Sequence, residues 1–293
     1  MHLTKKDKIG LVSTARKISE DELQPAINLL KSWGLDPVVA PEIFEIENQF
    51  AGSDAQRTMA FQRFLEDEEI KAILCVRGGY GSVRIIDQID FSALERNPKW
   101  IVGYSDVSVF HLHCAAQIGI PTLHATMPIN FASNSDSALV SLRKALFGEN
   151  LEYEVPSHPF NIEGSCQGEL IGGNLSIVYS VLGSPSMPPT SGKILFLEDL
   201  DEYLYHIDRM IYNLKRNGAL DDLAGIVIGG MTDMNDNTVP FGESAEEIIK
   251  RHVQDLGIPV AFGFPAGHLD DNRTLIMGQS ATLTVGNTTH LKW

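Results

Sequence analysis

The sequence has few cysteines, and their spacing suits neither a metal site nor a disulfide framework. The three cysteines, Cys75, Cys114 and Cys166, are an odd number, and each lies in or beside an apolar segment. Buried, reduced thiols are the simplest interpretation of such residues. Because disulfides persist mainly in oxidising compartments, thiols of this kind indicate a cytoplasmic protein.

Positive charge is also scarce, and long apolar runs are missing. Lysine and arginine number 23 against 38 aspartate and glutamate residues, so the formal net charge is -15. Nucleic acids and anionic membranes are bound through cations that meet their phosphates, so we expect neither as a partner. No stretch approaches the length of a membrane span, and the apolar run at residues 9–13 is too short for a signal-peptide core.

The chain does have enough apolar residues for a sizeable core, 43% of 293, and its length favours two domains. Over residues 1–132, short apolar runs alternate with helical patterns. The expected strands are 9–13, 37–40, 72–76, 100–104 and 121–124, and the expected helices are 20–33, 54–66, 82–88 and 107–118. This alternation predicts a parallel sheet with helices on both faces, which binds ligands at the carboxyl ends of its strands.

The second half of the chain is organised differently. Residues 133–163 carry Ser, Asn, Gly, Pro and charge around one amphipathic patch, and we interpret them as a linker. Residues 164–293 begin with Gly168-Glu-Leu-Ile-Gly-Gly-Asn174 and then mix strands and helices. They end with two expected strands, at 274–277 and 281–285, which predicts an α+β second domain.

Gly103-Tyr-Ser-Asp106 lies where an apolar run passes directly into a helical pattern. A serine at such a corner is held out of the strand, and the first N–H groups of the helix face whatever its hydroxyl attacks. We therefore predict that Ser105 is a nucleophile. The alternative is that Ser105 or Asp106 only caps the helix, since Val107 takes the place of the second glycine in Gly-x-Ser-x-Gly.

A serine nucleophile needs a base, and histidine has the pKa best suited to that task at neutral pH. His268 lies in the loop Phe264-Pro-Ala-Gly-His-Leu-Asp-Asp-Asn-Arg273, whose rigid flanks favour a functional side chain. Its alternative role is that of a polar loop residue. His111 and His113 lie on the helix after Ser105, and we expect both to be packing residues.

The imidazole in turn needs a carboxylate to orient it. Glu198 is the first charged residue after the apolar run 194–197, so it lies nearest to the buried layer. Asp199, Asp201 and Glu202 remain alternatives, because acidic residues also gather at helix N-termini without a catalytic role.

The glycine-rich turn Arg77-Gly-Gly-Tyr-Gly81 follows another expected strand. Paired glycines let the backbone approach a bound group, and their N–H groups can face a developing oxyanion. A dinucleotide loop is the rival interpretation, but Arg84 stands where that motif needs its third glycine, so we expect no nucleotide cofactor. Residues 232–237 lack the spacing of a calcium loop and indicate a turn.

Together these segments resemble the LD-carboxypeptidase family, the muramoyltetrapeptide carboxypeptidases of bacterial cell-wall recycling. The likeness runs over nearly the whole chain and rests on residues 77–81, 103–106, 197–199 and 267–268, in the family's order. It implies a Rossmann-like N-terminal domain and a smaller α+β C-terminal domain of the swivelling β/β/α type. The active site would lie in the cleft between the two domains.

The resemblance also implies a role for each matched residue. Ser105 would be the nucleophile, Glu198 the carboxylate and His268 the general base. The oxyanion donors would be the backbone N–H groups of Asp106 and of Gly79, with the neighbouring glycine at position 78 as the second choice.

The reaction implied is cleavage of a murein-derived tetrapeptide before its terminal D-alanine, through an acyl-enzyme and without metal or cofactor. We expect substrate contacts at Arg77, Gly78 and Asn174. An exopeptidase must also hold the free carboxylate of its substrate, and Arg77, Arg209 and Arg273 are the candidates. The family further implies a homodimer.

Two other functions remain open at this point. Immunity-type carboxypeptidases of the same family act on peptide-nucleotide antibiotics, although this chain shows no evident long insertion for a nucleotide. A non-catalytic ligand-binding protein can also have two α/β lobes around a cleft. The absence of an export signal speaks against that second alternative.

Overall fold

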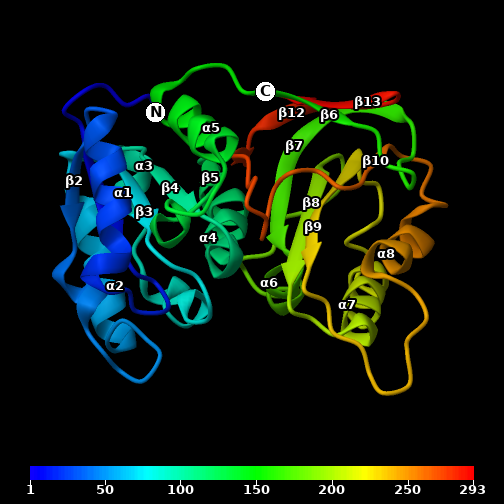
Figure 1. The fold of residues 1–293 in the computed structure, drawn as a ribbon, viewed down its shortest axis with the longest axis horizontal. Coiled ribbons are helices and arrows are strands. Elements are labelled where there is room, and N and C mark those ends of the chain that lie inside the picture. Colours follow the sequence, from blue (N-terminus) through cyan, green and yellow to red (C-terminus); the bar gives the residue numbers. More distant parts are fainter.

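The computed structural model describes residues 1–293, and its two β-sheets lie side by side in two lobes (Figure 1). Helices α4 (Ser108–His113) and α6 (Leu175–Ser180) lie between the lobes and contact each other. The predicted fold class, two α/β domains with parallel strands, is confirmed. No helix is both long enough and apolar enough to span a bilayer.

The first sheet has the strand order β11-β5-β4-β3-β1-β2, and strands β1 to β5 run parallel. These strands are β1 (Lys8–Val12), β2 (Asp36–Val39), β3 (Ile70–Cys75), β4 (Trp100–Gly103) and β5 (Thr122–His124). They alternate with α1 (Glu20–Ser32), α2 (Asp54–Glu66), α3 (Ser92–Arg96) and α4. Helices α1 and α2 both begin with a capping box, led by Ser19 and Ser53, and both begin at the predicted residues.

Two expected helices of this half are shorter than predicted. Residues 82–88 form two 3₁₀ turns, Ser82–Arg84 and Ile86–Gln88. The helix expected at 107–118 is α-helical only in α4, and a wider π-type turn, Cys114–Ile118, completes it. Short segments of this kind are marginal as α-helices, because few hydrogen bonds offset the cost of nucleation.

Strand β11 (Leu275–Met277) corrects the sequence interpretation, which placed it in the second domain. It returns to the first sheet and pairs antiparallel with β5, with Leu275 opposite His124 and Met277 opposite Thr122. The edge of β5 would otherwise present unpaired backbone groups, and β11 covers it. The last part of the chain therefore completes the first sheet.

The second sheet has the order β10-β9-β8-β7-β12-β13-β6. Its parallel part is β7 (Gly164–Asn174), β8 (Ile194–Leu200), β9 (Gly225–Thr232) and β10 (Val260–Ala261). Its antiparallel part adds β12 (Ser280–Val285), β13 (Thr288–Lys292) and β6 (Glu152–Pro156). Helices α7 (Leu204–Arg216) and α8 (Ala245–Val253) pack against each other on this lobe (Figure 1).

The stretch 133–163 holds more regular structure than its composition indicates. It contains helix α5 (Asp136–Phe147), which Ser135 caps and Gly148 ends, and the edge strand β6. In β6 exposed and buried side chains alternate, and Tyr153 and Val155 face inward. A five-residue alternation does not stand out among turn-forming neighbours, so this strand was not predicted from the sequence.

Candidate active site

The turn after β4 places Ser105 outside the strand. Tyr104 is still extended, and Ser105 then has a backbone φ of +63°. This is the left-handed region, which costs a non-glycine residue about 1–2 kcal/mol. Packing is close just before it, since a Cβ on Gly103 would lie 2.9 Å from Val107. No side chain caps α4, and the Ser105 hydroxyl instead bonds to His268, so the corner presents the hydroxyl rather than using it as a cap.

The strain at this corner predicts that Ser105→Gly is more stable than Ser105→Ala. Both variants lose the hydroxyl, but only glycine adopts a positive φ without strain. This relief exceeds the entropy that glycine adds to the unfolded chain, so we expect a difference of about 0.5–1 kcal/mol in the free energy of unfolding. Urea titration measures it. Ser180 lies in the right-handed helix α6, so there the alanine variant should be more stable than the glycine variant. If alanine were the more stable substitution at Ser105 as well, the prediction would be contradicted.

His268 connects Ser105 of the first lobe to Glu198 of the second. Its Nε2 lies 3.1 Å from Ser105 Oγ, and its Nδ1 lies 2.7 Å from Glu198 Oε2. The backbone N–H of His268 donates to the same carboxylate oxygen over 3.2 Å. When Nδ1 holds the proton facing Glu198, the lone pair of Nε2 is free to accept the proton of the serine hydroxyl.

Glu198 is fully buried, and the surrounding backbone encloses it. It lies on β8 where the register with β9 shifts, between Leu197 and Asp199. A Cβ on Gly267 would lie 2.6 Å from Glu198 Oε2, so only glycine, here with a φ of +106°, fits before His268. The second oxygen, Oε1, has no hydrogen-bond partner, so His268 is the main polar contact of this carboxylate.

The charges around His268 favour its protonated form. Burial by itself lowers the pKa of His268, but the charge and the hydrogen bond of Glu198, with the charge of Asp199, outweigh burial and raise the pKa. The ring of Tyr104 packs on the imidazole with centroids 4.8 Å apart. Burial raises the pKa of the Tyr104 phenol, so this neighbour stays neutral and fixes one face of the imidazole.

Asp199, the first alternative to Glu198, has other partners. It accepts hydrogen bonds from Asn174 Nδ2 over 2.8 Å and from the backbone N–H of Ser176 over 2.9 Å. Burial, followed by the charge of Glu198, raises its pKa to about 7. Asn174 Oδ1 in turn accepts the N–H of Ile177 and so caps α6. Asp199 and Asn174 therefore hold the start of α6.

The remaining two acidic alternatives lie farther along the chain. Asp201 is exposed, and its Oδ1 accepts a hydrogen bond from Asn235 over 2.7 Å. Glu202 lies 2.6 Å from the Nδ1 of His206. Of the four carboxylates, only Glu198 contacts the imidazole of the serine–histidine pair.

The glycine-rich turn after β3 lies against the Ser105 side chain. A Cβ on Gly78 would lie 3.1 Å from Ser105 Cβ and 3.3 Å from its Oγ, so this backbone borders the hydroxyl. Asp106 ties the two turns together, because its buried Oδ2 accepts the N–H of Ser82 over 2.8 Å. The N–H groups of Gly79 and Asp106 donate to no protein acceptor. Both donors are free in turns that meet at the hydroxyl.

Arg77, the first arginine expected at a substrate carboxylate, is partly engaged within the protein. Its guanidinium donates to the carbonyl of Lys17 over 3.3 Å and lies 3.6 Å from a carboxylate oxygen of Glu22. Both contacts draw this side chain toward the start of α1.

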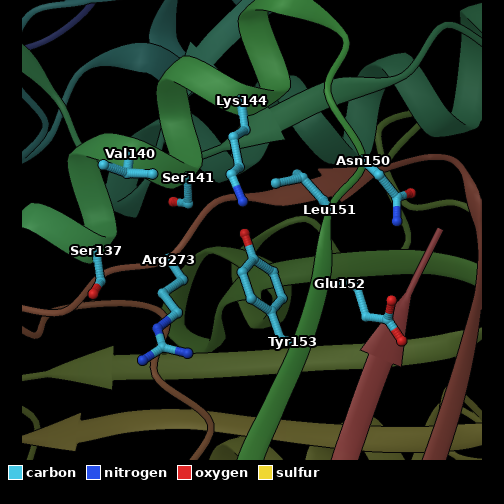
Figure 2. Close-up of a pocket in the computed structure, with 9 residues that line it drawn as sticks. All are labelled: Ser137, Val140, Ser141, Lys144, Asn150, Leu151, Glu152, Tyr153 and Arg273. Atoms are coloured by element: carbon cyan, nitrogen blue, oxygen red, sulfur yellow. The ribbon is translucent and has the colours of Figure 1, made fainter.

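The other two expected arginines lie elsewhere. Arg273 lines a cavity of about 220 Å³ between α5 and the start of β6, which Figure 2 shows, and no residue of the serine–histidine–glutamate line borders it. It pairs with Asp271 at 2.9 Å. Arg209 lies over the ring of Tyr205, 5.3 Å from its centroid.

The histidines that follow Ser105 on α4 are engaged in packing. His111 uses both ring nitrogens, toward Thr122 and the carbonyl of Gly103, and burial lowers its pKa to about 4. His113 bonds to Ser186. No three His, Cys, Asp or Glu side chains lie close enough together to hold a metal ion.

Two residues that support this site were not predicted from the sequence. Tyr104 packs on His268, and Ser82 links Asp106 to Thr14, whose hydroxyl lies 2.7 Å from that of Ser82. Tyr104 lies inside a predicted motif, next to its serine, and Ser82 directly follows the glycine-rich turn. That adjacency was the available signal, but the sequence does not show which neighbour of a motif faces the site.

Comparison with known families gives two matches that together span most of the chain. Residues 9–125 match the model of the LD-carboxypeptidase N-terminal domain. Residues 167–283 match the model of the LD-carboxypeptidase C-terminal domain.

Individual proteins are similar over most or nearly all of the chain. A probable murein peptide carboxypeptidase of Bacillus subtilis is 33% identical over 98% of this chain and 92% of its own. The crystal structure of a muramoyltetrapeptide carboxypeptidase from Oxalobacter formigenes has a TM-score of 0.88 at 27% identity, covering 97% of this chain and 98% of its own. The microcin C7 self-immunity protein of Escherichia coli is 25% identical over 81% of this chain and 78% of its own. A structure of a protein of that name with aspartyl sulfamoyl adenosine has a TM-score of 0.89 at 22% identity, over 99% and 97% of the two chains, which shows the fold alone. The two family matches and the 33% identity to the Bacillus subtilis protein show that the chain belongs to the LD-carboxypeptidase family.

Proposed function

We propose that this carboxypeptidase is of the serine type and releases the C-terminal D-alanine of murein tetrapeptides. The observation that carries the proposal is the hydrogen-bonded line from Ser105 through His268 to Glu198. It supplies a hydroxyl, a base and an orienting carboxylate in the order that acyl transfer needs. The names of the relatives, murein peptide and muramoyltetrapeptide carboxypeptidase, support the substrate class.

The first half of the proposed reaction forms an acyl-enzyme. His268 Nε2 takes the proton of Ser105, and the oxygen attacks the carbonyl carbon before the D-alanine. The N–H groups of Gly79 and Asp106 stabilise the oxyanion, and losing one such donor costs about 3 kcal/mol of transition-state stabilisation. Glu198 stabilises the imidazolium that forms.

The second half releases the products. His268 gives its proton to the departing amine, so that free D-alanine leaves and the peptide stays esterified to Ser105. Water then loses a proton to His268 and attacks the ester carbonyl. His268 returns that proton to the serine oxygen as the ester bond breaks, so the shortened peptide leaves with a free carboxylate and the serine hydroxyl is restored.

Substrate contacts at Arg77, Gly78 and Asn174 stay part of the proposal. Gly78 borders the Ser105 hydroxyl, which supports a backbone contact to the peptide. An amide nitrogen carries two hydrogens, so Asn174 Nδ2 has one left after its bond to Asp199.

Three further expectations also stay proposals. They are the division of the chain into 1–132, a connecting 133–163 and 164–293, a homodimer, and a cytoplasmic location. Sedimentation of the purified chain tests the homodimer.

The substrate is tested by incubating the protein with tetrapeptides that end in D-alanine or L-alanine, with either diaminopimelate or lysine before them. We expect D-alanine to be released from the first kind and little alanine from the second, as measured by mass spectrometry and chiral chromatography. Release of L-alanine at an equal rate would contradict the LD assignment.

Adding aspartyl sulfamoyl adenosine to this experiment as a second substrate separates the alternatives. An immunity-type carboxypeptidase would hydrolyse aspartyl sulfamoyl adenosine and leave the tetrapeptides intact. A ligand-binding protein would release nothing from either substrate. The bond between Ser105 and His268 argues against that last alternative, because a binding protein has no need of an activated hydroxyl.

A further inference from the structure

An exopeptidase must recognise the free carboxylate next to the bond it cuts. That carboxylate lies three covalent bonds beyond the scissile carbonyl carbon, at most about 4 Å away. The group that binds it must therefore lie close to Ser105. Of the three arginines expected for this task, Arg273 and Arg209 lie elsewhere, and Arg77 is drawn toward Glu22.

A fourth arginine, Arg16, lies directly on the glycine-rich turn. A Cβ on Gly79 would lie 2.6 Å from both Cδ and Nε of Arg16 and 2.9 Å from its Cγ. Only a residue without a side chain admits the arginine at this place. The neighbouring Gly78 borders the Ser105 hydroxyl. The hydroxyl thus lies against Gly78, and the guanidinium end of Arg16 lies against Gly79.

The backbone beneath Arg16 is fixed while its side chain is exposed. The hydroxyl of the buried Ser13 donates to the carbonyl of Arg16 over 2.5 Å. Arg16 also forms an isolated antiparallel bridge with Phe50. The loop after β1 is thus anchored on both sides, and the side chain leaves it from a defined position.

The guanidinium of Arg16 has no partner inside the protein. No carboxylate lies within 4 Å of it, in contrast to Arg57, Arg63, Arg84 and Arg251, which all pair with acidic residues. It also makes no side-chain hydrogen bond. In a chain of net charge -15, an unpaired cation beside the site attracts an anion that the rest of the surface repels.

We propose that Arg16 binds the C-terminal carboxylate of the peptide and thereby makes the enzyme select the last residue of a chain. The planar fork of a guanidinium suits both oxygens of a carboxylate at once. This inference rests on the proposed carboxypeptidase activity and names the group that recognises the free end of its substrate.

The test compares a tetrapeptide acid with the same peptide as its C-terminal amide, in the wild type, Arg16→Met and Arg16→Lys. The wild type should prefer the acid. Arg16→Met should lower kcat/KM for the acid by about 10- to 100-fold, as for a hydrogen-bonded charge pair, and leave the amide nearly unchanged. Arg16→Lys keeps the charge but lacks the planar fork, so its kcat/KM for the acid should lie between those of the wild type and Arg16→Met. Lys31→Met at the far end of α1 removes the same charge and should behave as the wild type.

The outcomes distinguish a failure of the role inferred for Arg16 from a failure of the proposed carboxypeptidase activity. An equal loss on acid and amide would mean that Arg16 only supports the glycine turn, and no loss on either would mean that another group binds the carboxylate. Both results overturn the inference and leave the proposed function intact. A wild type that cleaves neither peptide would overturn both.

Discussion

Ser105→Ala should lower kcat for the release of D-alanine by about 10⁵- to 10⁶-fold, the loss seen when a serine hydrolase loses its nucleophile. The hydroxyl has no other function in the structure, because it neither caps α4 nor bonds to any residue besides His268. Removing this one part-buried oxygen adds no atoms to the turn, so we expect the fold to be kept. Single-turnover assays with a tetrapeptide measure the loss, and circular dichroism and thermal unfolding show whether the fold is kept.

His268→Ala is the matched comparison for this prediction. Residues that act as one unit have effects that do not add, so the single variants and the double variant should be about equally inactive. A double variant with a far lower kcat than either single variant would mean that the two residues act independently. Ser105→Ala that keeps more than a small part of the activity would remove this serine from the reaction.

Glu198→Gln should lower the maximal kcat by about 10⁴-fold and move the acid limb of the pH profile downward. Glutamine has the same shape, but it carries no charge, and its NH₂ group can face Nδ1, which favours the wrong tautomer of His268. The substitution leaves no unpaired charge in the buried site. The loss therefore measures orientation and charge rather than unfolding.

The direction of the pH shift follows from the charges around His268. The reaction needs the neutral imidazole, so activity rises as the pH passes upward through the pKa of His268. Glu198 and Asp199 raise that pKa against the effect of burial, so the acid limb of the wild type lies at higher pH than for an ordinary histidine. Removing the charge of Glu198 lowers the pKa, and the limb of kcat/KM moves to lower pH.

Asp199→Asn provides the control for this second prediction. Its charge acts on His268 after that of Glu198, and its side chain does not touch the imidazole. The limb should move downward by less than in Glu198→Gln, and the plateau should keep most of its height. An unchanged acid limb in Glu198→Gln would show that this carboxylate does not govern the proton affinity of His268.

Both predictions depend on how the lobes are held together, because the serine comes from one and the carboxylate from the other. The backbone N–H of Asn174 donates to Ser108 Oγ over 2.9 Å, close to the turn that carries Ser105. A Cβ on Gly173 would lie 2.3 Å from the same oxygen, so the backbone at the end of β7 lies directly against the Ser108 side chain of α4. This close contact joins the two lobes three residues after Ser105.

Much of the first lobe was predictable from local patterns. The capping boxes at Ser19 and Ser53 fix the starts of α1 and α2, and the apolar runs fix β1, β3 and β4 within one or two residues. Such signals act over a few residues, so they are complete within the sequence segment that carries them.

The sequence by itself determined the alternation that makes a parallel sheet and the sharp corner at Ser105. It also determined the few histidines and carboxylates that could act as base and orienting group for this serine. Only the tertiary structure decided which members of that set meet. His268 and Ser105 are 163 positions apart, β11 crosses back to the first sheet, and Arg16 reaches Gly79 from another loop. The physical reason is that these contacts depend on the packing of two lobes, and no local propensity encodes how distant segments pack.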